Sequence, residues 1–130
     1  MFKRASGLRA LILSATLSAC GAGVTQAQPN GGQCLLSTNV ENFSAPDTHT
    51  VYLRVGANQI WRLDLMNDCL ELPNRLNIGL QATGGDPWIC KPIQATIMNQ
   101  GVAVPHRCPV RALHLLTPAQ VAALPKRDRP

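Results

Sequence analysis

Cys20 is the residue whose sequence context points most directly to a chemical modification. It ends the stretch Leu17-Ser18-Ala19-Cys20, in which a branched apolar residue and two small residues precede a cysteine. This order matches the lipobox, where lipoprotein signal peptidase cuts and where the cysteine thiol receives a diacylglycerol group. The sequence therefore predicts lipidation at Cys20.

Residues 1–19 have the composition of a bacterial signal peptide. Three basic residues precede an apolar run over 10–17, and small residues follow the run. The run is too short to span a bilayer, which takes about 20 residues, so we expect no permanent transmembrane helix. An ordinary cut after Ala22 or Ala27 also satisfies the small-residue rule, and it would release a soluble periplasmic protein.

Residues 20–33 have the composition of a flexible tether. Four glycines and one proline follow Cys20 in this stretch, and no side chain in it is charged. Position 21 is Gly rather than Asp, so the usual signal for retention in the inner membrane is missing. We therefore expect a lipid-anchored protein of the outer membrane that faces the periplasm and meets the membrane through its N-terminal lipid.

Four cysteines remain after Cys20, at positions 34, 69, 90 and 108. An even number in an oxidising compartment predicts two disulfides among Cys34, Cys69, Cys90 and Cys108, and three pairings are open. No two of them have the close spacing of a zinc ribbon, a thioredoxin-like motif or a haem attachment site. We expect no metal and no cofactor.

A β-hairpin is predicted over residues 51–55 and 59–65, with 56–58 as its loop. Both segments alternate apolar and polar side chains. Pairing Val55 with Gln59 sets Leu53 opposite Trp61 and brings the large apolar residues of both strands onto one face. A two-residue loop would set Leu53 against Arg62, so the three-residue loop is favoured.

The other face of this hairpin carries Tyr52, Arg54 and Arg62, the candidate binding residues of the sequence. One interpretation is a cationic aromatic strip that binds a ligand. The alternative is a half-solvated sheet face on which Arg62 stacks against Tyr52 and pairs with Asp64.

The remaining sequence predicts a mainly β fold. Strict alternation over 75–82 predicts a strand with Leu76 facing inward, and a turn is expected at 84–87. Thr117-Pro118 followed by Gln120 is typical of a capped helix start. We expect a small antiparallel sandwich or partly open barrel of five to six strands, with one short C-terminal helix and disulfide staples; the further strand candidates are 88–90, 93–98, 102–104 and 108–115.

One set of residues has the order and types found in a known family: Cys34, 51–56, 61–63, Cys69, 85–92, 107–110 and 116–125. On these residues the chain resembles a family of small exported proteins of Gram-negative bacteria, designated as a domain of unknown function, DUF6491. The resemblance covers about residues 34–125 and implies that all four cysteines after Cys20 are framework positions, but it implies no activity. Leu70 follows the second cysteine, where the family often has proline.

The formal net charge of +5 does not indicate a nucleic-acid partner. The positive excess lies in the signal segment and in the basic tail 126–130, whereas residues 20–125 carry equal numbers of acidic and basic side chains. A patch that could follow a phosphate backbone is therefore not expected. A short charged terminus is usually solvated, and we expect that of this tail.

These features lead to three hypotheses about function. The first is a non-enzymatic envelope lipoprotein whose single β domain, 34–125, binds or supports another envelope protein or peptidoglycan. The alternative is a soluble periplasmic protein that binds a small ligand. A hydrolase is the third: it would need a triad such as Ser44, Asp47 and His49, and three residues of one loop rarely converge in that way.

Overall fold

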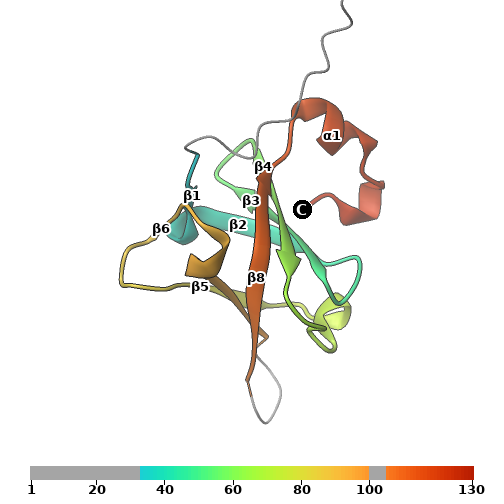
Figure 1. Cartoon of the computed structure of the whole chain (residues 1–130). Coiled ribbons are helices and arrows are strands. Elements are labelled where there is room, and N and C mark those ends of the chain that lie inside the picture. Colours follow the sequence, from blue (N-terminus) through green and yellow to red (C-terminus); the bar gives the residue numbers. More distant parts are fainter. Residues whose placement is uncertain (1–32, 100–104) are drawn as a thin grey trace, which may run out of the picture.

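The core of the protein is a six-stranded antiparallel sheet that curls into a half-barrel (Figure 1). The computed structural model describes residues 33–99 and 105–130. A two-stranded sheet of β1 (Leu35–Leu36) and β6 (Trp88–Ile89) lies beside it. In spatial order, the six strands are β2 (Val40–Ser44), β3 (Thr50–Val55), β4 (Gln59–Leu65), β8 (His106–Leu115), β7 (Ala95–Asn99) and β5 (Ile78–Ala82). The mainly β, partly open barrel is therefore confirmed.

The β3–β4 hairpin has the predicted register. Val55 pairs with Gln59 and Leu53 pairs with Trp61. Leu53 and Trp61 have no exposed surface, and Trp61 is the largest fully buried side chain among the described residues. In the turn, Gly56 takes a positive φ of 59° and donates its backbone N–H to the carbonyl of Asn39. The apolar face of the hairpin is thus the centre of the core.

β8 is the long strand that joins β4 to β7 in the middle of the sheet. Its residues 106–109 pair with β7, and its residues 110–115 pair with β4. The β4 pairing shifts register between Asp64 and Leu65, and a bulge of this kind increases local twist. Because β4 and β7 hold different halves of one long strand, the sheet curls. Its two outer strands, β2 and β5, remain edges.

Two predicted strands begin later in the structure, and the assignment of Leu76 was wrong. Leu76 is 91% exposed, because β5 begins only at Ile78, where its pairing with β7 begins. The chain before it forms a 3-10 turn over Leu72–Asn74. The 93–98 candidate likewise starts later, at Ala95, after a second 3-10 turn, Pro92–Gln94. The candidate at 102–104 lies outside the described residues.

The four cysteines form two interleaved disulfides, Cys34–Cys90 and Cys69–Cys108. Cys69 and Cys108 belong to the core, with exposed fractions of 0% and 5%. The other disulfide joins the ends of the β1–β6 pair, and its Cys90 is exposed. One crosslink is therefore part of the barrel interior, and the other staples a surface element.

The C-terminal helix α1 (Pro118–Ala123) begins with the predicted capping box. Thr117 Oγ1 accepts the backbone N–H of Gln120, and Gln120 Oε1 accepts the backbone N–H of Thr117. The basic side chains beyond the helix are exposed, as expected, but the tail that carries them is bonded to the domain. The Ser44 hydroxyl donates to the carbonyl of Asp128, and the Arg129 guanidinium donates to carbonyls of the α1 segment. These bonds fold the tail back over β2.

Candidate functional site

Of the three residues of the predicted face, Tyr52 is buried, Arg54 is partly buried and Arg62 is exposed. Tyr52 lies opposite Arg62 as expected, but only 8% of its surface is exposed. The C-terminal segment lies near these strands in Figure 1, and Ser44, the β2 partner of Tyr52, holds the carbonyl of Asp128. An aromatic strip open to a ligand is therefore not what these residues form.

Arg62 is held by a carboxylate on its own strand. Its Nε donates to Asp64 Oδ1 at 2.8 Å, and this hydrogen bond raises the pKa of Arg62 above its ordinary value, although partial burial opposes the shift. His114 of β8 lies across from Arg62, with its Nε2 3.6 Å from Asp64 Oδ2. This face therefore carries a cross-strand charge cluster of the kind that the sequence offered as the alternative to a binding strip.

Arg54 differs from Arg62 because its Nε is buried without a hydrogen-bond partner. The side chain borders a hollow of about 280 Å³ with Glu41, Gly56 and Ala57. Of the three predicted residues, Arg54 is thus the one whose hydrogen-bonding capacity is not fully used by the fold.

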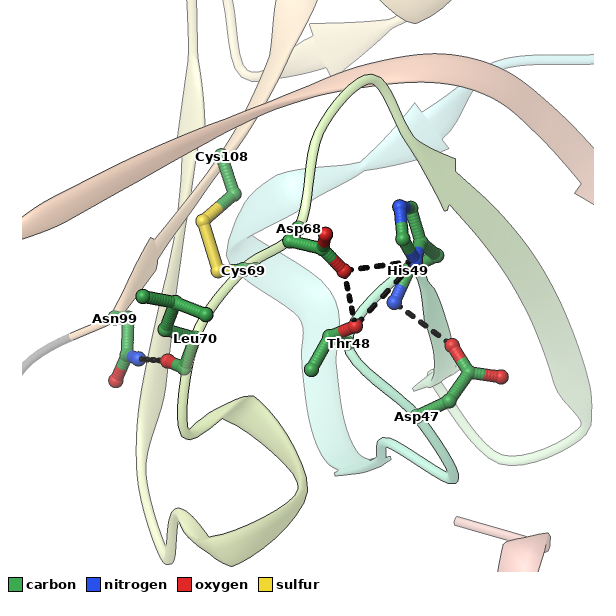
Figure 2. Close-up of a disulfide and its surroundings, with 8 residues drawn as sticks. All are labelled: Asp47, Thr48, His49, Asp68, Cys69, Leu70, Asn99 and Cys108. Atoms are coloured by element: carbon green, nitrogen blue, oxygen red, sulfur yellow. Dashed lines mark hydrogen bonds and ion pairs between the residues drawn. A yellow bond between two sulfur atoms is a disulfide. The ribbon is translucent and has the colours of Figure 1, made fainter.

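The histidine at position 49 does not form the proposed Ser-His-Asp triad. Asp47 Oδ1 instead accepts the backbone N–H groups of His49 and Thr50, each at 2.7 Å. Asp68 and the Thr48 hydroxyl both lie at the same ring nitrogen of His49, Nδ1, at 3.2 and 3.3 Å (Figure 2). A triad needs the acid and the nucleophile on opposite ring nitrogens, so this cluster lacks that geometry.

The same cluster organises the loop around the buried disulfide. Thr48 Oγ1 donates to Asp68 Oδ1 at 2.6 Å, and the backbone N–H of Cys69 donates to the Thr48 carbonyl at 2.9 Å. Figure 2 shows Asp68 next to the Cys69–Cys108 bond. The described residues contain no group of three or more His, Cys, Asp or Glu side chains that could hold a metal ion.

A groove around Trp88 is the surface that the sequence did not reveal. Its volume is about 480 Å³, and it lies between the β1–β6 pair and the β3–β4 turn. Trp88 is 49% exposed, which is unusual for so large an apolar side chain. We call this surface the Trp88 groove; its lining residues are Cys34, Leu36, Asn39, Val55, Gly56, Ala57, Asn58, Gln59 and Trp88.

Local bonds hold Trp88 in place. Its backbone N–H donates to Asp86 Oδ1 at 3.0 Å, and the residue pairs with Leu36 across the two-stranded sheet. The Cys34–Cys90 disulfide links the same two chain segments, two residues away from the Leu36–Trp88 pair. A strand pair and a disulfide therefore both fix the backbone that carries Trp88. In the sequence, the turn before Trp88 and Cys90 after it indicate that Trp88 is held in place. They do not indicate which residues surround its side chain.

A further hollow, of about 360 Å³, lies between β2 and β5, the edges of the half-barrel. Phe43 and Leu53 line it from one side, and Ile78 and Leu80 line it from the other. Glu41, Asn42 and Asn77 add polar groups, and the exposed Leu76 lies at its margin. We call it the seam groove, because it follows the opening of the barrel.

Comparison with known proteins identifies the chain by family alone. Neither described stretch contains a helix with the length and apolarity needed to cross a membrane. No curated protein and no solved structure matches the chain. One family model, described as a family of unknown function, matches residues 2–130, which is nearly the whole chain. The protein therefore belongs to this family, DUF6491.

Proposed function

We propose that this protein is a non-enzymatic cell-envelope lipoprotein whose disulfide-bonded β domain binds another envelope component. In this proposal Cys20 carries the lipid, and the domain faces the periplasm from the outer membrane. Cys20 and all but the last residue of the expected tether, 20–33, lie outside the described residues.

Two features support an exported, anchored protein. The basic start, the apolar run and the lipobox follow one another in the order of a lipoprotein signal. The two disulfides suit an oxidising compartment, since such bonds are rare in reducing cytoplasm. Both features concern location, and they leave the role of the domain to its surface.

The single observation that carries the binding role is the Trp88 groove. Trp88 is 49% exposed, and tryptophan is enriched among the residues that carry most of the binding energy at interfaces. Here the indole lies beside a hollow, and a disulfide and two short strands hold its backbone. A rigid aromatic group loses little conformational entropy on binding, so this arrangement favours recognition.

Palmitate labelling tests the anchor. We expect radiolabelled palmitate to enter the wild-type protein in cells and to be absent from Cys20→Ala. Label in the variant, or no label in either protein, would contradict lipidation at Cys20. The second result would favour cleavage by the ordinary signal peptidase.

Photo-crosslinking in intact cells tests the binding role. Trp88 is replaced by benzoylphenylalanine, which keeps an aromatic ring, and the same residue at Ile93 is the control. Ile93 is 75% exposed and does not line the Trp88 groove. We expect light-dependent adducts from position 88 alone. Equal yields at both positions would argue against a binding surface at Trp88.

The seam groove favours the alternative, a soluble periplasmic protein that binds a small ligand. Apolar and polar side chains both line it, and small-molecule sites combine the two. Under this alternative, a ligand from a metabolite library raises the melting temperature of the wild-type protein, and Leu80→Ala reduces that shift. A library that leaves the melting temperature unchanged would remove the support for it.

A further inference from the structure

We propose that the Trp88 groove binds an uncharged saccharide segment of a glycan. The inference rests on the proposed binding function and names the class of ligand. It is carried by the combination of one exposed indole, three side-chain amides and no charged group in a single hollow.

The indole of Trp88 supplies a flat apolar surface that half faces water. A pyranose ring has an apolar face of C–H groups that matches such a surface in shape. Stacking the two removes apolar area from water on both partners, which is favourable at about 25 cal/mol per Å². The indole N–H also leaves a polar handle at the ring edge.

Three carboxamides stand around this surface, those of Asn39, Asn58 and Gln59. Each amide offers two donors and one acceptor, and sugar hydroxyls both donate and accept. Gln59 is oriented by the core, because its Oε1 accepts the indole N–H of the buried Trp61 at 3.3 Å. The amide nitrogen of Gln59 therefore remains as a donor of fixed position.

The charge of the lining decides against other classes of ligand. None of the nine residues that line the Trp88 groove carries a formal charge. A phosphate, a carboxylate or a cationic peptide would lose hydration there without gaining a counter-charge. Arg54 and Glu41 border a separate hollow that shares only Gly56 and Ala57 with the groove. A neutral polar ligand suits this lining.

The backbone of Gly56 lies close to the side chain of Asn39 in the wall of the groove. Gly56 takes a positive φ, and a Cβ at this position would lie 3.1 Å from Asn39 Nδ2. A side chain there would push the Asn39 amide away by a few tenths of an ångström. The Cys34–Cys90 bond fixes the opposite wall, so both walls are set before a ligand arrives.

The test is a titration of the chain that remains after removal of the signal peptide, 20–130, with two probes, tetra-N-acetylchitotetraose and maltotetraose, followed by the two indole N–H signals in NMR. We expect the Trp88 signal to shift saturably with at least one probe, at a dissociation constant of about 1 mM. Co-sedimentation with purified peptidoglycan sacculi shows whether the glycan source is the cell wall. Shifts with free oligosaccharide and no co-sedimentation indicate a soluble or lipid-linked sugar.

Three variants make the assignment specific, with the signal of the Trp61 indole, which is bonded to Gln59 of the groove, as the common readout. Trp88→Ala should weaken binding more than tenfold, whereas Leu76→Ala, which also shortens an exposed apolar side chain, should leave it unchanged. Gln59→Glu retains an acceptor for Trp61 but replaces the amide donor, so we expect weaker binding at an unchanged melting temperature. Full binding by Trp88→Ala would overturn the assignment of the site.

Failure of this inference can be told from failure of the proposed function. If neither oligosaccharide moves the Trp88 signal and sacculi do not retain the protein, the saccharide assignment is wrong. A protein adduct from the crosslinker at position 88 would then leave the binding function standing with a protein partner. If the crosslinker yields no adduct above its control either, both proposals fall.

Discussion

The two disulfides should stabilise the domain by different amounts, although their loops predict nearly the same value. The Cys34–Cys90 and Cys69–Cys108 bonds span 56 and 39 residues, and chain entropy assigns each about 4 kcal/mol. On loop length alone, the double variant Cys34→Ala/Cys90→Ala would lose slightly more stability. Such a loss is a large fraction of the 5–15 kcal/mol that is typical for small domains.

Burial should reverse this order. Cys69 has no exposed surface and Cys108 is 5% exposed, whereas Cys90 is exposed. Removing two buried sulfur atoms loses about 1 kcal/mol of transfer free energy for each and leaves a cavity in the core. We therefore expect a loss of about 6 kcal/mol for Cys69→Ala/Cys108→Ala, against about 4 kcal/mol for the other pair.

Urea unfolding followed by circular dichroism measures both free energies of unfolding. Equal losses, or a larger loss for the Cys34/Cys90 variant, would refute the view that burial separates the two bonds. If Cys69→Ala/Cys108→Ala does not fold, the order in which the two disulfides of the wild-type protein are reduced tests the same reasoning. Graded reduction with alkylation and mass spectrometry should modify Cys34 and Cys90 first, and early modification of Cys69 would contradict the closed core.

Three further predictions concern the fold. Leu53→Ala, at a fully buried site, should cost about 2–5 kcal/mol in urea unfolding, while Leu76→Ala at a 91% exposed site should change stability by less than about 0.5 kcal/mol. Gly56→Ala should destabilise by about 1 kcal/mol or more, because φ is 59° there and the new Cβ meets Asn39; an unchanged midpoint would disprove the strain. Thr117→Ala should cost about 1 kcal/mol through loss of the helix cap, with a lower melting temperature as the readout and Thr117→Ser as the conservative control.

The hairpin was predictable because its information is local. Alternation along two adjacent segments and a three-residue loop leave one register that places Leu53 and Trp61 on the same side. The capping box of α1 was predictable for the same reason, since Thr117 and Gln120 satisfy each other's backbone within one turn. In both cases, the interacting groups lie within a few residues of one another.

The inward assignment of Leu76 failed because alternation does not show where a partner strand begins. β7 supplies pairing for β5 only from Ile78 onward. The docking of the tail was not predicted for a similar reason. Its basic side chains are exposed, as expected, but bonds from Ser44 and Arg129 attach the tail to the domain, and Ser44 lies 84 positions before its partner Asp128.

The amino-acid sequence by itself determined the mainly β class, the hairpin register, the helix start and the even set of framework cysteines. These follow from periodicity, capping and parity, which act over short distances or require only counting. The tertiary structure decided the pairing of the cysteines, the burial of Tyr52 and the existence of the Trp88 groove. Each of these joins segments far apart in the chain: Trp88 lines one groove with Asn39 and Gln59 only because folding brings β1, β6 and the β3–β4 turn together.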